Sequence, residues 1–380
     1  MSVPHFDAAV IGGGANGLAT AWHLARQRAG RVALIERFAL AHNRGSSHGA
    51  ARITRSSYGD ATHVRLMRIA HEEEWPRLER DSGATLIHRC DGVFFGPSDG
   101  PIRSYAAAVA EAGAAVEAID PAEARRRFPA FTFVNADQVL HDRTGGLIDA
   151  AASIAALVRV CLIEGVFIHE HTQVLGWSPV GNRTRIDTSR GAMTADRVVF
   201  ASGAWTTTLL PQLARRLTVK RQSVGYWPLR GDQARANLGS FPVWAYFGPG
   251  SNGLAYGLPT YQSPGLKAAF HETAGAADDP EAIEIARADT LAEVEEFLRE
   301  QLTLPLAPRA HAETCLYTST DDEDFVIDVI SEDPHLTVLS ACSGHGFKFA
   351  PLSGRVAANL ALMGRSGVAE FESERARFRM

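Results

Sequence analysis

Six residues near the start of the chain, at positions 12–17, constrain its fold more than any other segment. They read Gly-Gly-Gly-Ala-Asn-Gly and satisfy the pattern GxGxxG with Gly12, Gly14 and Gly17. The apolar run Phe6–Ile11 before them suits a buried parallel strand, and the stretch after them has the composition of a helix. The order strand, glycine turn, helix predicts a Rossmann-type βα unit.

An acidic residue completes this unit. Leu18–Arg28 is predicted to be the helix, and Arg31–Glu36 reads as a second strand that ends in a carboxylate. Glu36 follows Gly17 at about the spacing, roughly 20 residues, at which an acid binds the ribose hydroxyls of a dinucleotide. Glycines let the backbone approach a pyrophosphate, and the helix N-terminus offers its N–H groups to the anion. The sequence therefore predicts a dinucleotide site.

The unit alone does not distinguish NAD from FAD, because both dinucleotides carry the same ADP half. Its position at the very start of the chain favours FAD, and so does a sequence that never supplies a second compact nucleotide-binding half. An NAD-dependent dehydrogenase is the alternative that these residues leave open.

The composition excludes several classes of function. There are 38 basic and 43 acidic residues without a long run of like charge, so nucleic acid is not an expected partner. No stretch approaches the roughly 18 apolar residues of a membrane span, and residues 1–7 do not resemble a leader, so we expect a cytoplasmic protein with no membrane partner. Neither a disulfide scaffold nor a metal site is expected from four widely spaced cysteines, Cys90, Cys161, Cys315 and Cys342.

The length of 380 residues predicts two lobes. Val219–Phe270 is rich in strands and aromatic residues, unlike the βα opening, and is expected to form an antiparallel second lobe. Val64–Arg80 is expected to be a helix that is kinked or broken at Pro76. A strand that ends at Gly203 and a glycine turn at Ser343–Lys348 are further places where backbone could approach a cofactor, although plain strand ends use the same glycines.

Five ordered segments together resemble the monomeric sarcosine oxidase and N-methyltryptophan oxidase family, within the D-amino-acid-oxidase-like flavoproteins. They are GGGANG at 12–17, GSSHGAARITR at 45–55, YGLP and GLKAAFH within 256–271, TCLYTSTDDEDFVID at 314–328 and SGHGFKF at 343–349. The resemblance runs almost from end to end.

The resemblance implies the α/β fold of these flavoproteins. A Rossmann-type FAD-binding domain is expected from residues 1–85, 147–215 and 315–380. An antiparallel-sheet (α+β) substrate domain is expected from residues 86–146 and 216–314. The family also implies a monomer.

The resemblance further implies FAD bonded covalently through the sulfur of Cys315, chemistry that a thiolate permits. Otherwise a free cysteine is a small buried hydrophobe, which is how Cys90, Cys161 and Cys342 are interpreted. Arg52 is implied to lie against the flavin ring, where positive charge favours the anionic reduced form. The residues expected to contact the cofactor are Gly12, Gly14, Gly17, Glu36, His48, Arg52, Val174, Gly203, Trp205, Cys315, Gly344, Gly346, Phe347 and Lys348.

The substrate residues also follow from the resemblance. Arg55 and Lys348 are implied to bind a carboxylate, a task that suits the bidentate geometry of arginine. Lys267 matches the lysine that serves oxygen activation, and Tyr256 and His271 match residues that orient the amine. Together with Arg52, these last three form the expected catalytic set. Without the resemblance, an exposed lysine and a structural histidine would be the ordinary interpretations.

The activity implied is oxidation of a secondary α-amino acid, N-methylated or cyclic, to an imine, with O2 reduced to H2O2. Ala51 stands where sarcosine-oxidising relatives carry a hydroxyl residue, and Trp244, Tyr246 and Phe247 form a longer aromatic run. These departures favour a substrate bulkier than sarcosine, although aromatic residues in a sheet are often core. The alternatives are a dehydrogenase that passes electrons to a quinone or a protein, and a flavin-binding protein without catalysis.

Overall fold

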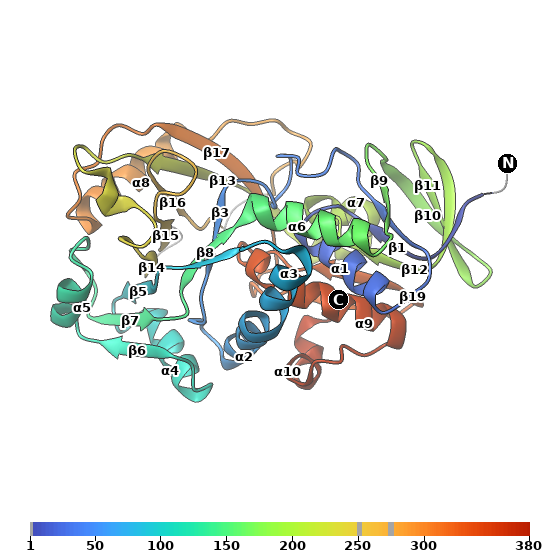
Figure 1. Ribbon diagram of the computed structural model, residues 1–380, viewed down its shortest axis with the longest axis horizontal. Coiled ribbons are helices and arrows are strands. Elements are labelled where there is room, and N and C mark those ends of the chain that lie inside the picture. Colours follow the sequence, from blue (N-terminus) through green and yellow to red (C-terminus); the bar gives the residue numbers. More distant parts are fainter. Residues whose placement is uncertain (1–2, 249–252, 273–276) are drawn as a thin grey trace.

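The structure, a computed structural model, describes residues 3–248, 253–272 and 277–380. Within these residues the strands form two eight-stranded sheets and a smaller one of three strands. Figure 1 shows the first large sheet in the right half of the molecule and the second in the left half, with the small sheet between them.

The first sheet has a parallel centre flanked by antiparallel strands. Its parallel strands, in order of pairing, are β9 (Phe167–His169), β2 (Val32–Ile35), β1 (His5–Ile11), β12 (Gly191–Phe200) and β19 (Asp333–Ser340). Its antiparallel strands are β10 (Val174–Val180) and β11 (Arg183–Thr188), which extend it from β12, and β18 (Val326–Ile330), which pairs with β19.

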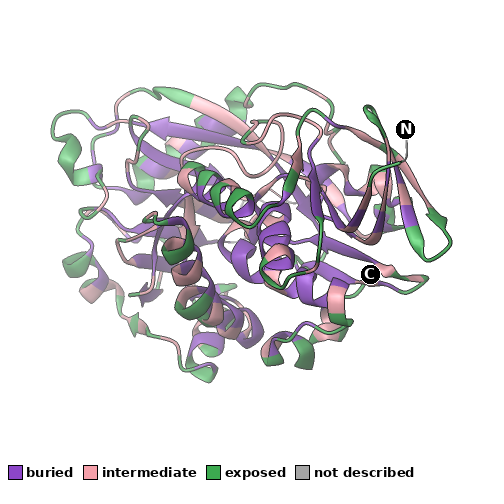
Figure 2. Ribbon diagram, turned by 45° about the vertical axis from the view of Figure 1, so that its right-hand side comes forward, coloured by how far each residue is buried: buried purple, intermediate pink, exposed green. Residues whose placement is uncertain are grey.

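Strand β1 is buried on both faces, as a central parallel strand must be. Ala8 and Val10 pack with the helices on one face, and Ala9 and Ile11 pack on the other. Figure 2 shows the helices of the first face buried along their inner sides and exposed along their outer sides. These helices are α1 (Ala15–Arg26), α6 (Ala150–Ile163) and α9 (Ala350–Met363).

The second sheet is antiparallel except for one parallel pair, β14 with β5. In spatial order its strands are β17 (His311–Ser319), β13 (Thr218–Trp227), β16 (Leu266–Phe270), β15 (Leu254–Leu258), β14 (Val243–Phe247), β5 (Gly92–Gly96), β7 (Gln138–Asp142) and β6 (Val116–Ile119). Trp244 and Tyr246 pack in a core cluster with Leu291 and Leu298 of α8 (Ala288–Gln301). These two rings are core, so the expectation that they enlarge a substrate pocket is wrong for them.

The small sheet joins the two halves. It consists of β3 (Ala51–Thr54), β8 (Gly146–Asp149) and β4 (Ile87–Arg89), all antiparallel. The remaining helices are α2 (Ala61–Ile69), a π-helical segment (Ala70–Glu74), α3 (Trp75–Ser82), α4 (Ile102–Glu111), α5 (Pro121–Arg127), α7 (Thr206–Leu209) and α10 (Ala369–Ser373). Short 3-10 turns occur at Gly203–Trp205, Pro211–Arg215, Gln233–Ala236, Gly346–Phe349 and Arg375–Phe378.

Three elements differ from the sequence expectations. Helix α1 begins at Ala15 and not at Leu18, because Gly14 is its N-cap and the glycine turn is already its first turn. The expected helix 64–80 contains a π-helical segment that ends at Glu74, two residues before Pro76, and the chain stays helical from this segment into α3. Helix α8 was not expected. Among the described residues no helix is long and apolar enough to cross a membrane.

Candidate active site

A cavity of about 420 Å³ runs from the glycine turn after β1 to strands β15, β16 and β17 of the second sheet. Its wall also includes the loop before β3 and the turn before α9. The expected site residues found in this wall are Gly12, Gly14, Glu36, His48, Arg52, Arg55, Val174, Gly203, Trp205, Tyr256, Lys267, His271, Cys315, Gly344, Gly346, Phe347 and Lys348.

Gly17 is the one expected site residue that is not part of the described cavity wall. A Cβ atom at Gly17 would overlap the carbonyl oxygen of Gly12, so this glycine allows α1 to lie directly against the end of β1. Gly12 has φ +112°, a conformation that disfavours any side chain. The two glycines thus shape the turn, and Gly12 also faces the cavity.

Glu36 lies at the end of β2 with its carboxylate in the cavity wall. The carboxylate accepts hydrogen bonds from the backbone N–H of Gly13 at 2.6 Å and of Phe38 at 2.8 Å. His42 approaches the same carboxylate at 3.5 Å. Backbone donors therefore hold the acid close to the glycine turn.

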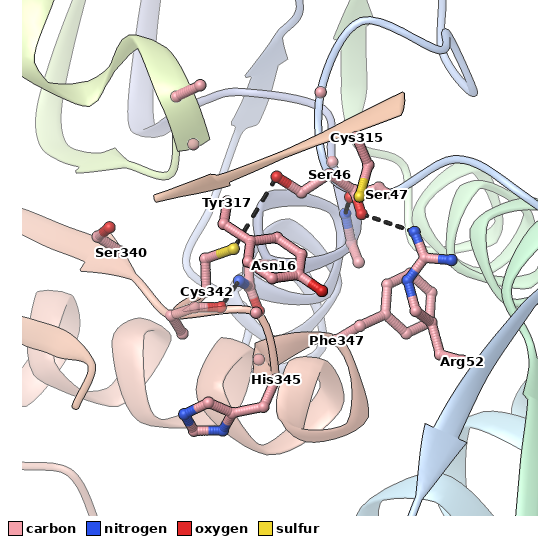
Figure 3. Close-up of a pocket in the computed structure, with 18 of the residues that line it drawn as sticks. Asn16, Ser46, Ser47, Arg52, Cys315, Tyr317, Ser340, Cys342, His345 and Phe347 are labelled. Carbon is pink, nitrogen blue, oxygen red and sulfur yellow. Dashed lines mark hydrogen bonds between the residues drawn. The ribbon is translucent and has the colours of Figure 1, made fainter. Parts of the chain in front are cut away.

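Arg52 projects from β3 into the middle of the cavity. Its guanidinium donates to the carbonyl oxygens of Ser46, His48 and Ala51 at 2.5–2.9 Å, and its Cζ lies 5.5 Å from the centroid of the Phe347 ring. Figure 3 shows Arg52 beside Phe347, with the Cys315 sulfur pointing into the same space. Three carbonyls fix the orientation of this cation.

A second arginine, Arg55, lies deeper and is 8% exposed. Its Cζ is 4.8 Å from the centroid of Tyr58 and 5.3 Å from that of Tyr105. Lys348, on the turn before α9, has its Nζ 5.6 Å from the same Tyr58 ring and donates to the carbonyl oxygen of His345 at 3.1 Å. Burial, with Arg55 and Arg52 nearby, holds the pKa of Lys348 well below its ordinary value. A guanidinium and a buried lysine amine thus converge at this end of the cavity.

Lys267, on β16, forms an ion pair with Glu313 on β17. The Lys267 Nζ is 3.2 Å from the Glu313 Oε1 and 3.3 Å from the carbonyl oxygen of Ala51. The same Oε1 accepts a hydrogen bond from the Tyr226 hydroxyl at 2.6 Å. Glu313 was not among the expected site residues.

Lysine is scarce in this chain. There are three lysines, Lys220, Lys267 and Lys348, and all three are buried. Lysine is among the residues least often buried, and here two of the three line one cavity. Scarcity in the sequence draws attention to all three lysines, and the structure separates Lys267 and Lys348, which line the cavity, from Lys220, which does not.

Cys315 lies on β17, on the same face as Tyr317. Burial raises the pKa of the Cys315 thiol, and the cations Arg52 and Lys267 oppose that rise. The Tyr317 hydroxyl lies 3.2 Å from that of Tyr256. Cys342, interpreted from the sequence as structural, also lines the cavity, with its sulfur 3.9 Å from the Ser46 hydroxyl (Figure 3).

Two histidines line the Lys348 end, and Glu323 contacts both. The Glu323 carboxylate lies 3.4 Å from the His271 Nε2, and its carbonyl oxygen lies 2.9 Å from the His345 Nε2. Burial lowers the pKa of His345 well below its ordinary value, so its Nε2–H donates to Glu323 and its Nδ1 accepts from the Tyr58 hydroxyl at 3.2 Å. Glu323 has φ +58°, a left-handed conformation that is uncommon for a residue other than glycine.

The family of the chain follows from comparison with known proteins. A family model described as "FAD dependent oxidoreductase" matches residues 7–360. The chain belongs to this family. It is 34% identical to the monomeric sarcosine oxidase of Streptomyces avermitilis, over 95% of this chain and 94% of that protein. It is 28% identical to the N-methyl-L-tryptophan oxidase of Yersinia pestis, over 93% and 94%.

A solved structure is similar as well. NikD, described as an unusual amino acid oxidase essential for nikkomycin biosynthesis, superposes with a TM-score of 0.83 at 26% identity, covering 99% of this chain and 97% of that one. The expected family and the expected α/β flavoprotein fold are therefore confirmed, and the protein is an FAD-dependent oxidoreductase.

The described residues fit FAD at the glycine-turn end of the cavity, and the other end leaves polar groups free for ligands. At one end, Gly12 leaves no room for a side chain, and Glu36 stands at the end of β2. The N-cap of α1, Gly14, has no side chain to cap the helix, and the Ser47 hydroxyl accepts from the N–H of Ala15 at 3.1 Å. At the other end, two buried nitrogens, the His48 Nε2 and the Arg55 Nη1, have no hydrogen-bond partner among the described residues. Buried polar groups are rarely left unpaired, so these atoms point to groups that ligands supply.

Proposed function

We propose that this protein is an oxidase of secondary α-amino acids, N-methylated or cyclic, that uses FAD to oxidise the C–N bond to an imine and reduces O2 to H2O2. The observation that carries the proposal is the pair Arg55 and Lys348, two buried basic side chains that converge at one end of the cavity. Relatives named sarcosine oxidase and N-methyl-L-tryptophan oxidase support the substrate class.

The substrate carboxylate binds between Arg55 and Lys348 in this proposal. Arginine offers two parallel donors to a carboxylate, and the Arg55 Nη1 has no hydrogen-bond partner among the described residues. Tyr256 and His271, further along the same wall, orient the amine. Only the neutral form of a bound amine has a lone pair to give, and His271 is the proposed acceptor of the proton that the amine loses.

FAD, when bound, supplies the acceptor for two electrons and passes them on to O2. Glu36 and the glycine turn hold its ADP half, and the walls formed by His48, Val174, Gly203, Trp205 and residues 344–348 enclose the rest. Arg52 supplies fixed positive charge in the middle of the cavity, and Lys267 supplies it where oxygen is reduced.

Cys315 is the proposed point of covalent attachment to the flavin. Its thiol lines the cavity, where burial raises the pKa of the thiol and the cations Arg52 and Lys267 oppose that rise. Joining the thiol to the 8α-methyl carbon removes two hydrogens, and O2, the oxidant of the proposed reaction, is their final acceptor.

The proposed function is tested by separating the two half-reactions. Without oxygen, the yellow protein is mixed with sarcosine, N-methyltryptophan, proline or pipecolate, and we expect at least one of them to bleach the flavin. Admitting O2 is then expected to restore the colour and to yield one H2O2 for each flavin. Bleaching that only a quinone or a protein acceptor reverses would identify a dehydrogenase instead. The monomeric state and cytoplasmic location stay predictions, which gel filtration and cell fractionation test.

A further inference from the structure

The carboxylate of Glu313 bridges two elements of the second sheet inside the cavity. Its Oε1 accepts from the Tyr226 hydroxyl of β13 at 2.6 Å and lies 3.2 Å from the Lys267 Nζ of β16. The backbone of Gly49 closes over it, since a Cβ there would lie 3.3 Å from the same oxygen. Glu313 is therefore held in place by neighbours on several sides.

The Lys267 ammonium has few hydrogen-bond acceptors other than this carboxylate. Its side chain is 7% exposed, and its Nζ has one other hydrogen-bond acceptor among the described residues, the carbonyl oxygen of Ala51. An ammonium carries three donors, so two are used by the protein and one is left for a ligand in the cavity. Glu313 and Ala51 together define the direction in which that third donor points.

The charges around Lys267 are otherwise unfavourable to an ammonium. Arg52 of β3 and burial both lower the pKa of Lys267, and Glu313 raises it. The other titratable groups that face it are Cys315 on β17, Tyr226 on β13 and His48 in the loop before β3. Burial lowers the pKa of His48 to about 4, so this histidine adds no charge at neutral pH. Glu313 is the one of these groups that carries negative charge at neutral pH.

We propose that Glu313 is a positioning residue for Lys267: it orients the ammonium and balances its charge, so that Lys267 stays protonated at the place where O2 is reduced. The effect on O2 reduction rests on the proposed function, whereas the ion pair between Glu313 and Lys267 does not depend on it. The carboxylate and the lysine form their ion pair whatever amine the enzyme oxidises.

Replacing Glu313 by glutamine keeps the shape and removes the charge. An opposite charge at this distance shifts a pKa by about one to three units, so Glu313→Gln is expected to lower the pKa of Lys267 by about that amount. Tyr226→Phe removes only the second hydrogen bond to the carboxylate and is expected to change the pKa of Lys267 much less. Together the two variants separate charge from orientation.

The three lysines of the chain make a direct measurement practical. Holoenzyme grown with [ε-13C]lysine gives one signal for each of Lys220, Lys267 and Lys348, and the pH dependence of each signal reports that residue's protonation. Lys267→Gln assigns its signal. Glu295→Gln is the matched control. Like Glu313, Glu295 accepts hydrogen bonds from one aromatic side chain, Trp227, and one cation, Arg299, but it lies on α8, outside the described cavity wall.

We expect the Lys267 signal to titrate at lower pH in Glu313→Gln than in the wild type, and to be unchanged in Glu295→Gln. As a second readout, photoreduced enzyme is mixed with O2, without any amine, and the rate of reoxidation is followed against pH. In Glu313→Gln this rate is expected to fall about tenfold for each pH unit above the lowered pKa of Lys267.

An unchanged titration of Lys267 in Glu313→Gln overturns the proposal, and so does an equal change in the control. If the glutamine variant does not fold, Glu313→Asp withdraws the carboxylate by one methylene and tests the same point. Failure of every amine to bleach the flavin would contradict the proposed function and leave the lysine titration as an independent result.

Discussion

Arg55 and Lys348 lie against the same aromatic ring. The Arg55 Cζ is 4.8 Å and the Lys348 Nζ is 5.6 Å from the centroid of Tyr58. They come from distant parts of the chain, one just after β3 and the other just before α9. Burial and the neighbouring arginine make it costly for Lys348 to hold its proton, and a carboxylate bound between the two side chains removes this cost. Their arrangement accounts for carboxylate binding in physical terms and leads to the first two predictions.

Arg55→Met is expected to weaken carboxylate binding by roughly ten- to a hundredfold, because a hydrogen bond to a charged group contributes about 1.5–3 kcal/mol. Arg55→Lys keeps the charge but loses the two-donor fork, and is expected to recover only part of the affinity. The change in the flavin spectrum on titration with propionate, a carboxylate without an amine, measures this. Arg65→Met, at a surface arginine paired with Glu111, is the control and should bind like the wild type. Equal affinity in Arg55→Met and the control would remove Arg55 from the binding site.

Lys348→Met is expected to stabilise the protein at neutral pH. The folded-state pKa of Lys348 lies well below 10.5, so between that value and 10.5 the unfolded chain binds a proton that the native protein does not. The free energy of unfolding of the wild type therefore rises with pH in this window, by on the order of 1 kcal/mol for each unit of pKa shift. The variant has no Lys348 to titrate, so its free energy of unfolding lacks this contribution. Thermal unfolding across the window should show a gap in Tm that narrows as the pH approaches about 10. A gap that stays constant with pH would contradict the lowered pKa of Lys348.

The first βα unit could be predicted from the sequence because all of its signals are local. The glycine turn, the strands beside it and Glu36 lie within one short segment, and each has a direct physical cause in backbone geometry. Even there, the sequence did not separate Gly17, which allows close packing, from Gly12, which faces the cavity. The packing role of Gly17 depends on the Gly12 carbonyl oxygen, which lies where a Cβ of residue 17 would be, and this position is set by the folded turn.

The partners of the site could not be predicted, because they come from strands far apart in the chain. Tyr226 reaches Glu313 across the register of β13 with β17, and that register is set by tertiary packing. One local signal was available: side chains alternate along a strand, so Glu313, Cys315 and Tyr317 must share a face. All three line the cavity. A strand assignment for residues 311–319 would have revealed Glu313.

The covalent attachment predicts a difference between two cysteines of the same cavity. In the wild type, flavin fluorescence should stay with the chain after acid denaturation and gel electrophoresis. Cys315→Ser is expected to release the flavin, and Cys342→Ser, whose sulfur lies near Ser46, is expected to retain it. Release from the wild type would contradict the linkage. If Cys342→Ser alone released the flavin, the linkage would have to be assigned to Cys342 instead of Cys315.

The glycine turn predicts that a single methyl group can abolish cofactor binding. In Gly17→Ala the new Cβ overlaps the Gly12 carbonyl oxygen, so α1 must move away from β1, at a cost of about 1–3 kcal/mol for overpacking. The displaced helix N-terminus then no longer meets the ADP half of FAD, and we expect a lower Tm and less flavin per protein. Gly176→Ala in β10 is the matched control, because no described atom lies within 4 Å of a Cβ there and its φ is not positive. The opposite result would be a Gly17→Ala protein with full flavin content and an unchanged Tm. It would show that the backbone moves here at little cost. The contact between α1 and the end of β1 would then not set the geometry of the dinucleotide site.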